Sequence, residues 1–122
     1  MSPIVPHFEI SEDDADAGAH LISLRGEIHV TTAPRLAEHL TEAIESGKTA
    51  IVLDMSDVEF IDSTGLSVLL NALRLVGQRD GALALVCTNP TVLRLFQITG
   101  LESTFDIFDD RAKAIAHVTR AQ

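Results

Sequence analysis

The sequence has little of several residue types on which whole classes of protein depend. It contains one cysteine, Cys87, and nine lysines and arginines among 122 residues. A single cysteine forms no internal disulfide and supports no cysteine-based zinc site, so the chain suits a reducing compartment. No stretch reaches the roughly 18 uninterrupted apolar residues of a membrane span. Met1–Ile10 also lacks the basic start and apolar core of a signal peptide, and we expect a cytoplasmic protein.

The shortage of basic residues limits the partners of the chain. Eighteen aspartates and glutamates give a net charge of −9 at neutral pH. Nucleic acids and anionic membrane surfaces are bound through clustered lysines and arginines, which are scattered here, so we expect neither as a direct partner. An acidic chain associates fastest with a partner that carries a basic patch, although such a charge also serves simple solubility.

Motifs for catalysis and nucleotide binding are missing as well. No serine lies in a G-x-S-x-G elbow, and neither G-x-G-x-x-G nor a Walker sequence occurs. Of the five histidines, only His29 lies in a loop at the same strand-end edge as Ser63. Three aspartates at strand ends, Asp54, Asp57 and Asp62, leave a catalytic carboxylate pair open, but loop aspartates mostly cap helices and make turns. We therefore expect that the protein is not an enzyme and that it binds no cofactor.

Four carboxylates lie within five positions, at Glu12, Asp13, Asp14 and Asp16. Their spacing does not follow the alternating ligands and closing glutamate of a calcium loop, so we expect no metal site. We interpret residues 12–18 as a solvated turn between two strands.

What the sequence does have is an alternation of strand-like and helix-like segments. Apolar residues make up 46% of the chain, enough for a single domain over residues 1–122. The segments expected as strands start at Phe8–Ile10 and continue with His20–Gly26, Ala50–Leu53, Ala82–Cys87 and Phe105–Phe108. The expected helices follow Thr32 and Pro34, span Thr64–Val76, start at Asn89–Pro90, and follow Asp109 or Asp110.

The resulting order is ββαβαβαβα. Strands that alternate with helices pair in parallel through right-handed crossovers. The first two strands form a hairpin and add an antiparallel portion. We therefore expect an α/β fold with a mixed, mostly parallel sheet and helices packed on it. Asp54, Ser56 and Asp57 are expected as loop residues after the strand Ala50–Leu53.

One stretch, Val58–Leu66, stands between a buried strand and a helix. Its polar turn, Asp62–Gly65, lies at the edge where open α/β sheets place their sites. Asp62 or Ser63 caps the following helix, which by itself contributes about 1 kcal/mol. Gly65 costs roughly 1 kcal/mol inside a helix, but it permits the close approach of a bulky group. Local physics alone predicts a polar cap here.

The same residues carry a resemblance to a known family. The sequence resembles the STAS domain of bacterial anti-sigma-factor antagonists at Gly26–Ile28, Ala33–Leu36, Ile51–Asp54 and Phe60–Leu66. Downstream, the match continues at Val86–Cys87, Asn89–Pro90, Val92, Arg94–Phe96 and Ile98–Leu101. The Asp-Ser-Thr-Gly-Leu segment, Asp62–Leu66, is its most specific part.

The resemblance implies a regulator of transcription, for example in a stress response, that works by partner switching. Unphosphorylated, it would bind an anti-sigma factor of the histidine-kinase-like ATPase class and release the sigma factor. That partner would phosphorylate Ser63 and switch the binding off, and a metal-dependent Ser/Thr phosphatase would reset the switch. The residues expected at the partner surface are Thr31, Thr32, Asp62, Thr64, Gly65, Leu66 and Ser67.

Two alternatives stay open at this stage. Family members commonly carry an aspartate after Gly-Glu-hydrophobic, where this chain has His29. His29 either tunes the switch or is a loop residue that varies freely. The second alternative is a STAS scaffold that is never phosphorylated, for instance a subunit of a lipid-transport assembly.

Overall fold

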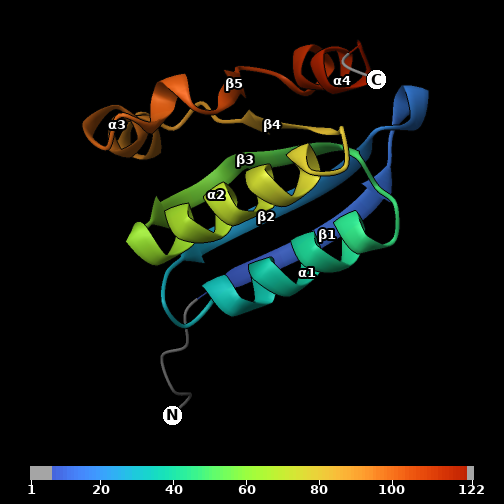
Figure 1. Ribbon diagram of the computed structural model, residues 1–122. Coiled ribbons are helices and arrows are strands. Elements are labelled where there is room, and N and C mark those ends of the chain that lie inside the picture. Colours follow the sequence, from blue (N-terminus) through green and yellow to red (C-terminus); the bar gives the residue numbers. More distant parts are fainter. Residues whose placement is uncertain (1–6, 121–122) are drawn as a thin grey trace.

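The computed structural model describes residues 7–120, and its elements follow the expected order ββαβαβαβα (Figure 1). The strands are β1 (Phe8–Asp14), β2 (His20–Ile28), β3 (Ala50–Ile61), β4 (Ala82–Val86) and β5 (Asp106–Phe108). The helices are α1 (Ala33–Glu45), α2 (Ser63–Gly77), α3 (Pro90–Ile98) and α4 (Arg111–Arg120), with 3₁₀ turns η1 (Asp16–Gly18) and η2 (Leu101–Ser103).

The five strands form one sheet in the order β1-β2-β3-β4-β5. β1 runs antiparallel to β2, while β2, β3, β4 and β5 pair in parallel. This confirms the mixed, mostly parallel sheet and the antiparallel opening hairpin.

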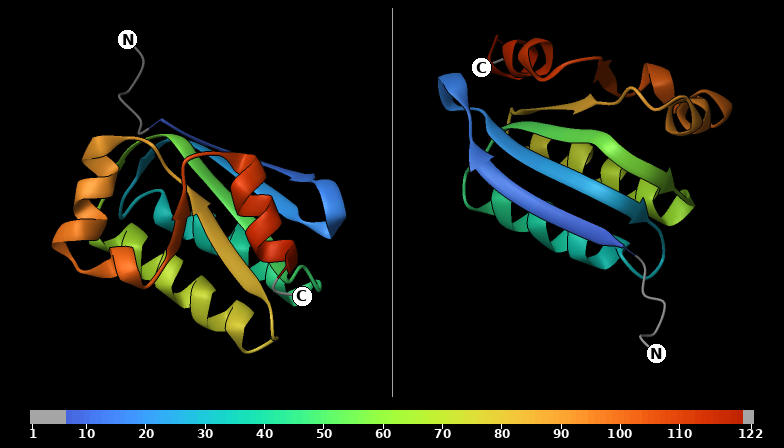
Figure 2. Two further views of the ribbon diagram at one scale, coloured as in Figure 1. Left: turned by 90° about the horizontal axis from the view of Figure 1, so that it is seen from above. Right: turned by 180° about the vertical axis from the view of Figure 1, so that it is seen from behind.

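Helices lie on both faces of the sheet. α1 and α2 lie side by side against one face, and α4 lies over β3 and β4 on the other (Figures 1 and 2). Along β3, Ile51 and Leu53 join the core under α1 and α2, whereas Ala50 and Val52 join the core under α4. The continuous apolar run of this strand is therefore buried on both faces, as its sequence predicts.

The prediction of a loop after Leu53 is wrong, because β3 continues through Asp54, Ser56 and Asp57 to Ile61. Asp54 is only 7% exposed, yet its carboxylate accepts hydrogen bonds from the N–H and hydroxyl of Ser56, at 2.9 and 2.6 Å. It also accepts one from Nε of Arg111 in α4, at 2.5 Å. A partner 57 residues away thus allows a carboxylate in a central strand, and the local sequence gives no sign of it.

The expected turn at residues 12–18 is also shorter than predicted, since β1 extends to Asp14. The carboxylate of Glu12 accepts hydrogen bonds from the rings of His20, at 2.6 Å, and of His39 on α1. Partial burial raises the pKa of Glu12, but the bonds from His39 and His20 outweigh it and hold the pKa below its usual value. Side chains of β2 and α1 therefore bind the carboxylate of Glu12 and allow this acidic segment to form a strand.

Gly65 lies where the first turn of α2 packs closely against β2 and β3. A Cβ atom at Gly65 would lie 2.7 Å from Cγ2 of Ile28 and 2.7 Å from Cγ1 of Ile61. Both contacts are shorter than carbon atoms tolerate, so only glycine lets the first turn of α2 rest on β2 and β3.

We expect Gly65→Ala to lower the free energy of unfolding by about 1–3 kcal/mol, the cost of overpacking a core. The helix propensity of alanine, worth about 1 kcal/mol, works in the opposite direction and is outweighed. Gly77→Ala, in the same helix, is the matched control, because nothing lies within 4 Å of a Cβ there. Urea denaturation of both variants is the measurement, and a Gly65→Ala protein as stable as the wild type contradicts the packing.

A second prediction concerns the pH dependence that Asp54 gives to stability. Burial raises the pKa of Asp54, but the bonds from Ser56 and Arg111 outweigh it and leave the pKa below its usual value. Because the pKa is lowered on folding, the stabilisation is present above the unfolded pKa of about 4 and is lost as the pH falls through the folded pKa.

Asp54→Asn should therefore lower the free energy of unfolding at pH 7 by about 1–3 kcal/mol. The difference from the wild type should shrink in acid, as the wild-type carboxylate takes up a proton. The control is Asp57→Asn, an exposed carboxylate 3.7 Å from Arg25, which should change the free energy by less than about 1 kcal/mol at any pH. A pH-independent effect of Asp54→Asn would contradict the charge-based account.

Candidate functional site

The turn between β3 and α2 is tied to the end of β2 by its backbone. The N–H of Asp62 donates to the carbonyl oxygen of Ile28 at 3.0 Å. The side chain of Asp62 accepts from the N–H of Gly65 at 3.0 Å, and its carbonyl accepts from the N–H of Leu66 at 3.0 Å. Asp62 is thus the N-cap of α2, which settles the choice between Asp62 and Ser63.

Ser63 is the first residue of α2 and is exposed. Its hydroxyl has no hydrogen-bond partner among residues 7–120, whereas its carbonyl accepts from the hydroxyl of Ser67 at 2.9 Å. The first N–H groups of a helix have no acceptor within the helix, and its dipole favours negative charge at this end. The site therefore presents a free hydroxyl at a place that is suited to an anion.

The loop between β2 and α1 lies beside this turn, because Ile28 also pairs with Ile61. Thr32 occupies the N-cap position of α1, as expected, but its hydroxyl stabilises the loop instead. It donates to the carbonyl of Glu27 at 2.7 Å and accepts from the N–H of His29 at 3.0 Å. Nδ1 of His29 accepts from the N–H of Thr31 at 3.2 Å, so the imidazole is held within its own loop.

The seven residues expected at a partner surface differ in exposure. Thr31 and Ser67 are exposed, Asp62 and Thr64 are half-buried, and Thr32, Gly65 and Leu66 are buried. The structure brings their segments together at one edge of the sheet, but the three buried residues are placed to shape the surface rather than to touch a partner.

Sequence analysis missed two apolar residues of this edge. Val30, in the loop before α1, is 69% exposed, and Phe60, near the end of β3, is 42% exposed. Phe60 lies opposite Glu27 in the β2–β3 register. Phe60 lies between the buried Val58 and Ile61, so the local sequence does not show which apolar residue of this strand end is exposed.

The three aspartates considered for catalysis are each engaged in a structural contact. Asp54 is bound to Ser56 and Arg111, Asp57 lies 3.7 Å from Arg25, and Asp62 caps α2. Across residues 7–120, no helix has the length and apolar character to cross a membrane. In the same described part, no group of three or more histidine, cysteine, aspartate or glutamate side chains is arranged to hold a metal ion.

Comparison with known proteins agrees with this geometry. A family model described as "STAS domain" matches residues 12–114. The anti-sigma-B factor antagonist of Listeria monocytogenes is 39% identical over 102 residues, which cover 81% of this chain and 85% of that protein.

Solved structures show the same architecture. An anti-sigma factor antagonist from Mycobacterium paratuberculosis superposes with a TM-score of 0.84 at 30% identity, covering 92% of this chain and 94% of that one. The Bacillus protein SpoIIAA in its phosphorylated form shares the fold, with a TM-score of 0.70 at 23% identity over 90% of this chain and 99% of that one. By its sequence match and its architecture, the chain belongs to the STAS domain family.

Proposed function

We propose that this protein is an anti-sigma factor antagonist whose binding surface is centred on Ser63. The observation that carries the proposal is the exposed hydroxyl of Ser63, without a partner among the described residues, at the first position of α2. The name of the Listeria relative, 39% identical to this chain, supports the same function. Unphosphorylated, the surface binds an anti-sigma factor, which then releases its sigma factor in the cytoplasm.

The surface around Ser63 has the composition of a protein interface. Val30 and Phe60 supply exposed apolar area, and Thr31 and Ser67 supply hydroxyl groups around it. Large apolar side chains surrounded by polar ones are typical of such interfaces. Thr32, Gly65 and Leu66 contribute from below by fixing the loop and the first turn of α2.

Phosphorylation of Ser63 by the anti-sigma factor, acting as a kinase of the histidine-kinase-like ATPase class, switches the binding off. A phosphate adds about 1.5–2 negative charges at neutral pH, and the N-terminus of α2 partly compensates them, so the fold tolerates the modification. An apolar interface closed over the same dianion would desolvate it. A hundredfold loss of affinity requires only about 2.7 kcal/mol.

Resetting the switch requires removal of the phosphate by a metal-dependent Ser/Thr phosphatase. The exposure of Ser63 at the end of the sheet leaves a phosphate there accessible to such an enzyme. SpoIIAA, which shares only the fold, has been solved both unphosphorylated and phosphorylated, so this architecture accommodates both forms in that protein.

The first test is phosphorylation by the anti-sigma kinase encoded nearest to this chain's gene. With ATP, we expect one phosphate per chain, located on Ser63 by mass spectrometry, and none on Ser63→Ala. Ser67→Ala and Thr64→Ala, which remove the two other hydroxyls near Ser63 on α2, should still be labelled.

Two results would count against this assignment. Labelling that persists in Ser63→Ala moves the switch to another residue. Binding of the kinase without any labelling favours a scaffold that is not phosphorylated.

The second test separates binding from folding. Ser63→Asp should weaken binding of the same kinase at least tenfold, because it places a charge at the centre of the surface. Its melting temperature should change by only a few degrees, since a helix N-terminus favours an acidic side chain. Gln78→Glu, at the other end of α2, adds the same charge and should bind like the wild type. A Ser63→Asp protein that unfolds would show instead that Ser63 is structural.

A further inference from the structure

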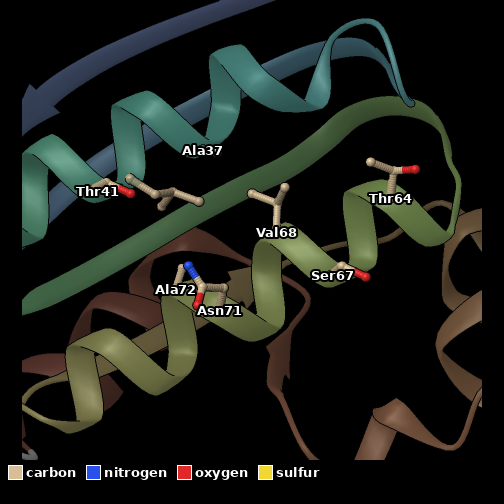
Figure 3. Close-up of a pocket in the computed structure, with 8 residues that line it drawn as sticks. Ala37, Thr41, Thr64, Ser67, Val68, Asn71 and Ala72 are labelled. Carbon is tan, nitrogen blue, oxygen red and sulfur yellow. The ribbon is translucent and has the colours of Figure 1, made fainter.

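A groove between α1 and α2 begins at Thr64, the residue that follows Ser63 (Figure 3). Its volume is about 230 Å³, and it runs along the side of α2 that faces α1. Its lining consists of Ala37, Leu40 and Thr41 from α1 and Thr64, Ser67, Val68, Asn71 and Ala72 from α2.

The groove is apolar inside and uncharged throughout. Leu40 and Ala72 are buried at its floor, Val68 projects toward α1, and the small side chain of Ala37 leaves the space open. An apolar cavity of about 150 Å³ holds a benzene molecule. The groove is therefore large enough for one bulky aliphatic or aromatic side chain.

The surface on the α1 side of the groove is negatively charged. Glu38, Glu42 and Glu45 are exposed on α1, and they lie on the turns that also carry Ala37 and Thr41. On the α2 side, Ser67 and Asn71 are exposed, and the guanidinium of Arg74 donates to Oδ1 of Asn71 at 2.7 Å. A segment that fills this groove meets carboxylates on the α1 side, which favours lysine or arginine in the occupant.

The groove is continuous with the surface around Ser63. Thr64 and Ser67 line the groove, and they lie in the first turn and at the start of the second turn of α2. The hydroxyl of Ser67 donates to the carbonyl of Ser63 at 2.9 Å. A partner that covers the hydroxyl of Ser63 therefore reaches the mouth of the groove without leaving the surface.

We propose that the groove receives a bulky apolar side chain of the anti-sigma factor, from a segment in which lysine or arginine flanks that side chain. This inference rests on the proposed function and adds a second site of contact with the anti-sigma factor. The turn at Ser63 carries the switch, and the groove carries affinity that does not depend on the phosphate.

The test fills the groove from its α1 side. Ala37→Leu should raise the dissociation constant for the anti-sigma kinase at least tenfold, because the added side chain occupies the place of the partner's. The matched control is Ala112→Leu, the same change at an exposed position of α4, which lies over the opposite face of the sheet. It should bind like the wild type. If Ala37→Leu is poorly folded by its melting temperature, Thr41→Leu fills the same groove and takes its place.

The charge of the occupant is tested separately. The double variant Glu38→Lys/Glu42→Lys should slow association at least threefold at low salt, and the difference should fade as ionic strength rises. Glu102→Lys, an exposed carboxylate in η2, is the control and should leave the rate unchanged. A photo-crosslinking residue at position 71 should capture a partner peptide with a large apolar residue next to lysine or arginine, and one at position 113 should not.

The outcomes distinguish this inference from the proposed function. If the wild type binds, Ser63→Asp does not, and Ala37→Leu binds like the wild type, the groove is empty in the complex and the inference is wrong while the switch stands. A crosslinked peptide rich in acidic residues would overturn the charge argument. If the wild type does not bind the kinase at all, both proposals fail.

Discussion

The hydrogen bond from the N–H of Asp62 to the carbonyl of Ile28 joins the two loops on which the candidate site depends. It holds the β3–α2 turn against the end of β2, and the Asp62 carboxylate then caps α2 from the same position. Gly65 completes the arrangement, because the missing Cβ lets the first turn of α2 settle onto Ile28 and Ile61. These contacts occupy the carboxylate and carbonyl of Asp62 and leave the hydroxyl of Ser63 exposed, without a partner among the described residues.

The proposed function needs one group that alters binding without altering the fold, and the position of this hydroxyl suits that role. A helix N-terminus tolerates negative charge, whereas an apolar contact surface does not. Val30 and Phe60 provide such a surface beside the turn, and the α1–α2 groove extends it along α2. In the proposed mechanism, a phosphate on Ser63 weakens the interface that closes over the turn, and the structure of the core beneath the turn does not change.

The sequence predicted the order of elements because apolar spacing records which face of each segment is buried. It also located the cap of α3 at Asn89 and narrowed the cap of α2 to Asp62 or Ser63, since caps depend on neighbouring residues alone. The prediction from sequence failed where a polar segment forms a strand because residues far away in the sequence bind its carboxylates. Asp54 is bound by Arg111, and Glu12 by His20 and His39, and neither pairing has a local signal.

The candidate site was predictable to a similar extent. The Asp-Ser-Thr-Gly-Leu motif located Ser63. The sequence did not distinguish the exposed residues of this edge from the buried ones, Thr32, Gly65 and Leu66. The groove between α1 and α2 arises from two segments that meet only in the folded chain, so no single stretch of sequence reveals it.

The proposed switch at Ser63 is tested by measuring the affinity of the fully phosphorylated protein for the anti-sigma kinase and comparing it with that of the unphosphorylated protein. Phosphorylation on Ser63 should raise the dissociation constant about a hundredfold, or about 2.7 kcal/mol, while the melting temperature changes by a few degrees. Equal affinity of the two forms would contradict it.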